Sequence, residues 1–467
     1  MYSHSYKYFF VIGILTFLLL SCKKFVQVEP PITNPTSNSV YQNDATAIAV
    51  LSSIYNQMQF NGIAGGTQSI STLTALNSDE LKNYSVDLLL SQSYSNALRN
   101  SSPVLFWNNL YNFIYISNAA IEGINKSTTL SSAVKQQLLG EAKFLRGFFY
   151  FYLVNLYGDV PLLLTTDYRI NAKASREDTD KVYEQIINDL KEAEDLLNDN
   201  YVGLDAILTT TERIRPNKAS ASAMLARVYL YTGNWAESEN EATKVINNTR
   251  YSLVSNLNNV FKKNSTEAIW QIQPVNPQFN TLDAAAYILT SEPGSNNYFA
   301  LTNNLVSSFD DVDARKSNWI KSFTVGAKTY YYAFKYQVNA AQPSSEYAMV
   351  IRLAEVYLIR AEARARQEKV GDAQSDLNAV RARAKLPGTT ANTKDLLIVA
   401  LEKERELELF TEWGHRWFDI KRLGRASAIM SVITPQKGGV WSDNWKLYPI
   451  PQSEILLNKN LTQNDGY

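Results

Sequence analysis

Apolar residues recur every three or four positions through much of this chain, a spacing that places them on one face of a helix. Between residues 135 and 157 one stripe is formed by Leu138, Ala142, Leu145, Phe149, Tyr152 and Leu156. Between residues 181 and 197 a second is formed by Val182, Ile186, Leu190, Ala193 and Leu197. Gly158 and Pro161 follow the first stripe, and these residue types end helices. The pattern therefore predicts amphipathic helices over 135–157 and 181–197.

A short string repeats within the helical part of the chain. LARVYL at residues 225–230 returns as LAEVYL at residues 353–358. Gly233-Asn234 follows the first copy and Gly371-Asp372 follows the second, so each copy should precede a glycine turn and another helix. In the later copy that second helix has one apolar stripe, formed by Ala373, Leu377, Val380 and Ala384. This order indicates two TPR-like helix pairs, although six matching residues in an Ala- and Leu-rich chain also arise by chance.

Residues 250–345 lack the helical period. They contain Pro274, Pro277, Pro293, Gly294, runs of Asn and Ser, and the aromatic string Tyr330-Tyr331-Tyr332. These residue types predict loops and short strands. We therefore expect a mainly α fold in which TPR-like helix pairs form a scaffold around a loop-rich insert at 250–345. An N-terminal helical region over 44–249 and a C-terminal one over 346–467 flank that insert.

The N-terminus has a different pattern. An apolar run of about 13 residues at 8–20 follows Lys7, and it is shorter than the roughly 20 residues that a spanning helix needs. The run ends in Leu-Leu-Ser-Cys at 19–22, which resembles a bacterial lipoprotein signal, and Cys22 is the only cysteine in the chain. We predict a signal peptide over 1–21 and a lipid on Cys22, with an ordinary secretory signal and an incidental cysteine as the alternative.

The remaining chain has an even charge balance. The full sequence has 45 basic and 45 acidic residues, and losing Lys7 with the signal leaves 44 against 45, a net charge of −1. Such a balance argues against a nucleic-acid partner. Residues 22–43 are polar and contain prolines, which predicts an extended tether between lipid and body. We therefore expect acyl chains, and not a spanning helix, to hold the protein on a membrane.

Five longer strings carry a family resemblance. They are EAKFLRGFFYFYLVNLYGDVPLL (141–163), RPNKASASAMLARVYLYTGNWAESENEATKVI (215–246), IRLAEVYLIRAEARA (351–365), EKERELELFTEWGHRWFDIKRLG (402–424) and LYPIPQSEILLNKNLTQNDGY (447–467). In this order, and behind a lipoprotein signal, they resemble the SusD/RagB family of outer-membrane nutrient-binding lipoproteins. The resemblance runs nearly end to end and is weakest over 60–105 and 270–345.

The resemblance implies a fold, a location and a role. Members combine TPR-like helix pairs with a loop-rich face, lie on the surface of Gram-negative cells, and help to load a SusC-like TonB-dependent transporter. Most known ligands are oligosaccharides, some are peptides, and members are not enzymes. Surface lipoproteins of this kind often carry acidic residues after the cysteine, whereas Lys23 and Lys24 stand here. The prediction that the protein lies in the outer leaflet therefore rests on the resemblance alone.

The charged string 402–424 has two readings. Paired carboxylates there could do acid–base work. We instead expect a helix with solvated charges, together with Arg416, Asp419 and Arg422 bonding loops to the helical frame through guanidinium–carboxylate pairs. Replacing Asp419 should then cost stability before ligand affinity.

Metal and nucleophile chemistry have few candidates. His415 is the only histidine after the predicted signal, and Cys22 is assigned to lipid, so a Cys/His pair is excluded and we expect His415 to be packed. Asp310, Asp311 and Asp313 lack the glycine and glutamate that complete a calcium loop. We expect no metal, cofactor or catalytic residue, although a glycosidase needs only two carboxylates.

Aromatic residues outside the apolar stripes supply candidate ligand contacts. The chain has 28 tyrosines and 8 tryptophans, and such rings cover the C–H face of a sugar while their polar edge stays hydrated. Neighbouring Asn and Asp side chains would bond its hydroxyls. The resemblance places ligand contacts in loops of the first third and the middle of the chain. The candidates there are Asn77, Asp79, Tyr84, Tyr94, Tyr298 and Trp319, with loop packing as the alternative for each.

These features together predict a non-enzymatic lipoprotein of the outer membrane that faces the exterior. It would bind oligosaccharides and deliver them to a SusC-like transporter. A peptide cargo on the same architecture is the alternative, and a glycosidase is a third hypothesis.

Overall fold

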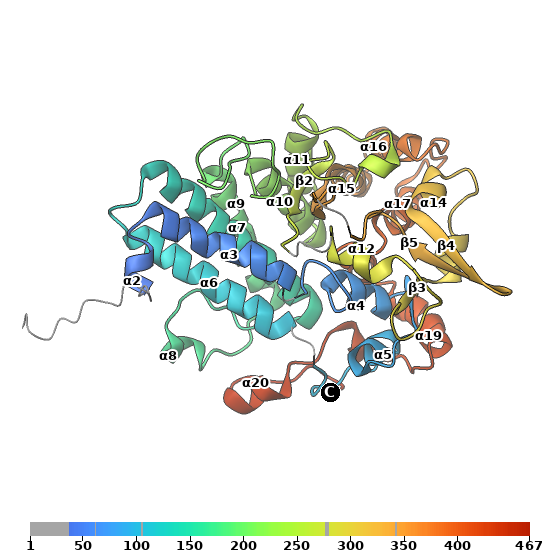
Figure 1. Cartoon of the computed structure of the whole chain (residues 1–467), viewed down its shortest axis with the longest axis horizontal. Helices are drawn as coiled ribbons and strands as arrows, with labels where there is room; N and C mark the ends of the chain where they lie inside the picture. The colour runs from blue at the N-terminus through green and yellow to red at the C-terminus, as the bar shows by residue number, and fades with distance from the viewer. Residues whose placement is uncertain (1–36, 61, 104–105, 276–279, 341–342) are drawn as a thin grey trace, which may run out of the picture.

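The computed structural model describes residues 37–60, 62–103, 106–275, 280–340 and 343–467 (Figure 1). The predicted signal peptide, Cys22 and most of the tether over 22–43 lie outside the described residues. In the described part of the chain, no helix combines the length and the apolar character needed to cross a bilayer.

Four long N-terminal helices lie side by side at the left of Figure 1. They are α3 (Asp44–Phe60), α6 (Phe106–Lys126), α7 (Ser132–Tyr157) and α9 (Thr179–Leu196), with the short α2 (Ser37–Val40) against α6. The helices predicted over 135–157 and 181–197 are thus confirmed as α7 and α9. Helix α7 is packed by α6 on one side and α9 on another, so most of its residues are buried. Gly158 ends it with φ 74, a conformation that favours glycine.

Each copy of the repeated string lies in the first helix of a helix–turn–helix pair. The pairs are α10 (Lys218–Tyr231) with α11 (Trp235–Ile246), and α15 (Leu353–Arg366) with α16 (Val370–Arg383), and α11 packs on α15. The first turn contains Gly233 with φ 77, as predicted. The prediction for the second turn is wrong. Gly371 lies in the first turn of α16, and the left-handed residue between the helices is Glu368 with φ 63.

Corresponding residues of the two copies bond to each other. Arg227 stands third in LARVYL and Glu355 stands third in LAEVYL. Their helices α10 and α15 pack together, and the Arg227 guanidinium donates from Nε and Nη2 to the two Glu355 carboxylate oxygens at 2.6 and 2.7 Å. Each side chain is only 2% exposed. The repeat is therefore joined across its own interface by a buried two-bond ion pair.

The remaining helices are short or belong to the C-terminal region. They are α4 (Ile70–Asn77), α5 (Leu88–Tyr94), α8 (Tyr168–Asn171), α12 (Leu282–Tyr287), α13 (Asn303–Ser307), α14 (Ala314–Trp319), α17 (Lys394–Leu409), α18 (His415–Arg422), α19 (Ala426–Gln436) and α20 (Gln452–Leu457), with 3-10 turns η2 (Leu257–Asn259) and η3 (Asp443–Lys446).

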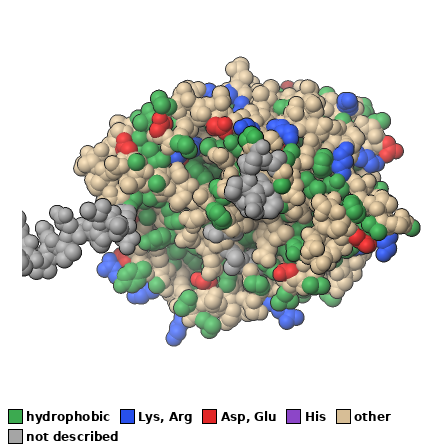
Figure 2. All heavy atoms as spheres, viewed as in Figure 1, with side chains coloured by type: hydrophobic (Ala, Val, Ile, Leu, Met, Phe, Trp, Pro, Cys, Tyr) green, Lys and Arg blue, Asp and Glu red, His purple; other side chains and the backbone are tan. Residues whose placement is uncertain are grey.

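Side chains of both charge signs are scattered over the face shown in Figure 2, which agrees with the even charge balance of the chain.

In the described part of the chain, six short strands form three separate antiparallel pairs. They are β1 (Leu81–Asn83) with β3 (Phe299–Leu301), β2 (Ala268–Ile272) with β6 (Ala348–Arg352), and β4 (Ile320–Val325) with β5 (Lys328–Ala333). Most of these strands and the short helices α12 to α14 fall within residues 250–345, between the helical regions. The structure is therefore mainly α with a loop-rich, short-stranded insert. The β4–β5 hairpin projects at the right of Figure 1.

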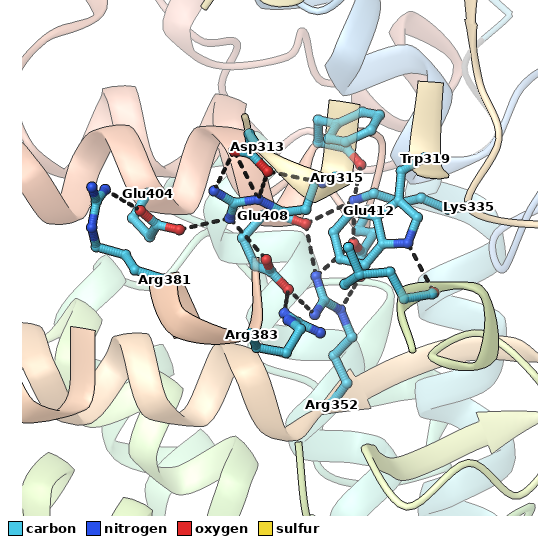
Figure 3. A network of polar contacts seen from close by, with 12 residues as sticks. Asp313, Arg315, Trp319, Lys335, Arg352, Arg381, Arg383, Glu404, Glu408 and Glu412 are labelled. Atoms are coloured by element: carbon cyan, nitrogen blue, oxygen red, sulfur yellow. Dashed lines mark hydrogen bonds and ion pairs between the residues drawn. The ribbon is translucent and has the colours of Figure 1, made fainter. Parts of the chain in front are cut away.

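A buried ion network joins this hairpin to α17 (Figure 3). Glu408 accepts hydrogen bonds from Arg315 at 3.0 Å and Arg352 at 2.5 Å, and a further one from Arg383. Glu412 accepts from Arg352 at 2.8 Å and from Lys335 at 2.5 Å. Burial would raise the pKa of Glu408, but the three arginines hold it well below its usual range. Burial lowers the pKa of Lys335 to about 8.

The network overturns the expectation of solvated charges along 402–424. Glu404, Arg405 and Glu408 are at most 1% exposed. Arg315 precedes β4 by a few residues and Lys335 follows β5, so both ends of the hairpin are tied to one helix. Charged side chains of this string therefore lie inside the protein, where ionised groups are tolerated only when they are paired.

Candidate functional site

An open cleft of about 430 Å³ lies where β1, β3 and β5 meet α5 and the end of α19. Its rings come from four tyrosines: Tyr84, Tyr94, Tyr330 and Tyr331. Its polar side chains are mainly amides and lysines: Asn303, Asn304, Gln436, Lys82, Lys328 and Lys437. All four tyrosines are half-buried, so each has a fixed position and an accessible part.

Strand geometry brings two of these rings together. Residues two apart on an extended chain point to the same side, which pairs Lys82 with Tyr84 at β1 and Lys328 with Tyr330 on β5. The backbone N–H of Tyr84 donates to the Tyr298 carbonyl at 2.8 Å, which continues the β1–β3 pairing. The Tyr84 and Tyr330 rings meet edge to face with centroids 5.7 Å apart and planes at 82°. This is a favoured aromatic arrangement.

The Tyr330 hydroxyl is directed away from the lining residues. It donates to Glu292 Oε1 at 2.7 Å, and this hydrogen bond raises the pKa of Tyr330 to about 12. Glu292 itself is exposed and does not line the cleft. Two contacts therefore fix the orientation of the Tyr330 ring: the hydrogen bond from its hydroxyl to Glu292 and the edge-to-face contact with Tyr84.

Asp79, one of the lining residues, is held as an anion by Arg416. Arg416 donates to it from Nε and Nη2 at 2.8 and 2.7 Å. Burial alone would raise the pKa of Asp79, but the hydrogen bonds and charge of Arg416 lower it. Burial, and then the charge of Asp79, raise the pKa of the neighbouring Glu80 to about 8. The Glu80 carboxyl therefore ionises less readily than the Asp79 carboxyl beside it.

Lys437, just after α19, connects two of the segments that line the cleft. Its ammonium donates to the carbonyls of Leu76 at 2.8 Å, Asn77 at 3.2 Å and Ser78. These carbonyls lie at the C-terminal end of α4, where helix carbonyls lack partners within the helix and attract cations. Lys437 thus joins the end of α19 to the segment that carries Asp79.

The structure sorts the six candidate residues. Asp79, Tyr84 and Tyr94 line the cleft together. Tyr298 is half-buried beside them and contributes its carbonyl to the backbone of Tyr84, although its side chain is not among the lining groups.

Two of the six are misplaced by the prediction. Asn77 is 2% exposed, donates to the Ser93 carbonyl at 3.0 Å and accepts from the Tyr448 hydroxyl at 2.5 Å. Trp319 is 0% exposed and donates from Nε1 to the Leu257 carbonyl at 3.0 Å, and it lies beside Lys335 of the ion network (Figure 3). Both side chains have their partners inside the protein, so the expectation that they contact a ligand is wrong.

Most of the lining residues were missed as candidates, including the rings of Tyr330 and Tyr331, the lysines Lys82, Lys328 and Lys437, and the amides Asn303, Asn304 and Gln436. The alternation in LKNY and KTYY, a lysine two residues before a tyrosine, was the available signal for two lysines and Tyr330. This lysine–tyrosine spacing is a weak indication of a binding site, because it is common in strands. It points to a shared site only when both strands are known to face one cleft.

Residues considered for chemistry have structural roles. His415 is 4% exposed, 3.8 Å from Glu355, and burial lowers its pKa to about 4, so the prediction that it is packed is confirmed. Asp313 caps α14 and bonds Arg315. Among the described residues, no three His, Cys, Asp or Glu side chains gather in a group able to hold a metal ion.

The charged residues of α18 connect separate elements. Arg416 ties the α4–β1 loop to α18, as expected. Asp419 and Arg422 join helices instead of loops. Asp419 accepts from Arg405 of α17 at 2.7 Å, and Arg422 donates twice to Glu362 of α15 at 2.7 Å.

Family models match both halves of the chain. Residues 211–467 match the model described as SusD family, and residues 24–230 match one described as starch-binding associating with outer membrane. A SusD-like protein of Formosa agariphila is 23% identical over 97% of this chain and 97% of its own. The starch-binding protein SusD of Bacteroides thetaiotaomicron is 35% identical over 28% of this chain and 23% of its own.

Solved structures share the fold. A SusD superfamily protein from Bacteroides vulgatus superposes with a TM-score of 0.77 at 22% identity, over 91% of this chain and 99% of that one. A laminarin-binding SusD-like protein superposes with a TM-score of 0.74 at 24% identity, over 91% of this chain and 100% of that one.

Proposed function

This chain belongs to the SusD family, and from that premise we propose that its cleft binds an oligosaccharide, which the protein passes to a SusC-like TonB-dependent transporter. The observation that carries the proposal is the edge-to-face pair of Tyr84 and Tyr330 within an open, amide-lined cleft. Rings so held suit the C–H faces of sugars, and Asn and Gln side chains suit their hydroxyls. The starch-binding and laminarin-binding relatives support the same ligand class.

The cleft is arranged for binding and not for hydrolysis. Glycosidases place two carboxylic groups across the scissile bond, one of them protonated. In the described part of the chain, Asp79 is the one carboxylate among the lining residues, and Arg416 occupies it. The neighbouring Glu80 is 3% exposed and accepts from the backbone N–H of Thr411. We therefore propose a protein that is not an enzyme.

Alanine at either paired tyrosine should weaken glycan binding. We expect Tyr84→Ala and Tyr330→Ala each to lower the affinity for a bound oligosaccharide about tenfold or more, because each removes a ring at the centre of the contact surface. Isothermal titration against oligosaccharides from a glycan array measures this. Tyr330→Phe, which keeps the ring and loses the Glu292 hydrogen bond, should retain binding.

The control is Tyr168→Ala on α8, a tyrosine that is 77% exposed and outside the cleft, and it should leave affinity unchanged. Melting temperatures show that each variant is folded. Unchanged affinity in both cleft variants would contradict the assignment of this site. Silence across the glycan array, with a peptide co-purifying from the native complex, would favour a peptide cargo instead.

We further propose that Cys22 carries the lipid that anchors the protein to the outer membrane, facing the exterior. Cells grown with radioactive palmitate should label the wild-type protein and leave Cys22→Ala unlabelled, because the diacylglycerol would be attached to that sulfur and the chain has no other cysteine. An unlabelled wild-type protein would contradict the anchor. Protease treatment of intact cells should remove the protein, and complete protection would contradict the exterior orientation.

A further inference from the structure

We propose that the cleft selects acidic oligosaccharides, whose carboxylate or sulfate groups pair with Lys82 and Lys328. The inference rests on the proposed sugar-binding function and names the ligand class within it. It follows from the charges on the lining residues and from their positions on two strands.

The lining residues carry an excess of positive charge. Two exposed lysines, Lys82 and Lys328, line the cleft, and Asp79 is the single lining carboxylate within the described chain. A third lining lysine, Lys437, does not count toward this excess, because its ammonium is bonded to the carbonyls at the end of α4 and burial lowers its pKa to about 7. Asp79 is already matched by the two hydrogen bonds from Arg416, so it does not neutralise a lysine. Excess charge of one sign in a concave site attracts ligands of the other sign.

Neighbouring acids do not remove this excess. Glu80 is buried and bonded to the Thr411 backbone, away from solvent. Glu292 lies outside the lining and accepts the Tyr330 hydroxyl. Among the described residues, neither Lys82 nor Lys328 has a carboxylate oxygen within ion-pair distance. The Lys82 ammonium lies over the Tyr84 ring, 5.2 Å from its centroid.

The two lysines lie where they can contact the edge of a sugar stacked on a tyrosine ring. Lys82 lies two residues before Tyr84, and Lys328 lies two residues before Tyr330, on the same side of their strands. An acidic sugar carries its carboxylate or sulfate at the edge of its ring. A sugar with a face on either tyrosine therefore presents that group toward the lysine beside it. A hydrogen bond between two charged groups is about twice as strong as one between neutral groups.

The test compares probes that differ only in charge. Hexameric oligogalacturonate is measured against its fully methyl-esterified form, and a sulfated carrageenan oligosaccharide against its desulfated form, by titration with the whole protein. We expect at least one acidic probe to bind about tenfold more tightly than its neutral form. Raising NaCl from about 50 mM to about 500 mM should weaken that binding several-fold.

Variants locate the effect. Lys82→Gln with Lys328→Gln should abolish the preference for the acidic probe and leave the melting temperature unchanged, since both lysines are exposed. Lys321→Gln is the matched control, an exposed lysine on β4 of the same hairpin that does not line the cleft. It should leave the preference intact.

Three outcomes would overturn the inference. Equal affinity for charged and neutral probes, with both lost in Tyr330→Ala, would leave the sugar-binding function standing and refute the charge preference. Binding of no glycan of either class would refute both proposals. Equal affinity for an oligoglutamate of the same charge would show recognition of charge without sugar and refute the ligand class.

Discussion

Glu408→Gln should lower the free energy of unfolding by about 3–5 kcal/mol, the usual cost of removing one partner from a buried ion pair. The substitution keeps the size of the side chain and removes the charge that Arg315, Arg352 and Arg383 share. Three guanidinium groups, each at most 3% exposed, would then keep Asp313, Glu404, Glu412 and Glu267 but lose their common anion. Urea denaturation followed by circular dichroism measures the change.

The matched control lies two residues earlier on the same helix. Glu406 pairs with Lys403 at 3.3 Å, and the lysine side chain is 44% exposed. Glu406 also lies 3.8 Å from Arg416, which keeps its two hydrogen bonds to Asp79, so Glu406→Gln should cost no more than about 1 kcal/mol. Similar losses in both variants would contradict the role given to the network. Because Arg315 precedes β4 and would lose its ion pair with the Glu408 side chain, Glu408→Gln should also weaken glycan binding by loosening that end of the hairpin that carries Tyr330.

Arg227→Met is expected to destabilise the protein by a similar amount, about 3–5 kcal/mol, because it leaves Glu355 buried without its two-bond partner. The double variant Arg227→Met with Glu355→Met should recover most of that loss, since two apolar side chains of similar volume remove both charges from the α10–α15 interface. The same denaturation experiment tests both variants. A double variant as unstable as the sum of its single variants would show that the two residues act independently.

The same pair predicts a dependence on pH. Burial would raise the pKa of Glu355, but Arg227 and then His415 lower it from 4.5 to about 2. A carboxylate with a lowered pKa stabilises the folded state above its unfolded pKa, and that contribution is lost as pH falls toward the folded value. The stability difference between wild type and Glu355→Gln should therefore shrink as pH falls from about 5 to about 3. A constant difference across this range would contradict the lowered pKa.

Local patterns predicted the helical frame because helix formation depends on neighbours within a few turns. The stripes over 135–157 and 181–197 are α7 and α9, and each copy of the repeated string lies in the first helix of a helix pair. The error at Gly371 has a local cause as well. A three-residue connection ends α15 with Glu368 in the left-handed conformation, which leaves Gly371 free to join α16.

The candidate site was predicted only in part. Polar neighbours along the sequence do not show whether a side chain is buried or exposed in the folded protein. Tyr84 and Trp319 both stand among polar residues, yet one lines the cleft and the other is enclosed by the ion network. Lys82 and Lys328 were missed for the converse reason. Each is an ordinary exposed lysine until β1 and β5, more than 240 positions apart in the chain, are brought to one cleft.

The sequence by itself determined the helices, the repeat, the lipoprotein-like start and the family, since each is carried by residues close together or in a fixed order. Only the tertiary structure decided which charges are interior and which rings share a surface. Glu408 meets arginines from α14, β6 and α16, and it is tolerated inside because all three arrive together. Burial and charge pairing depend on the packing of distant segments, which no single stretch of sequence contains.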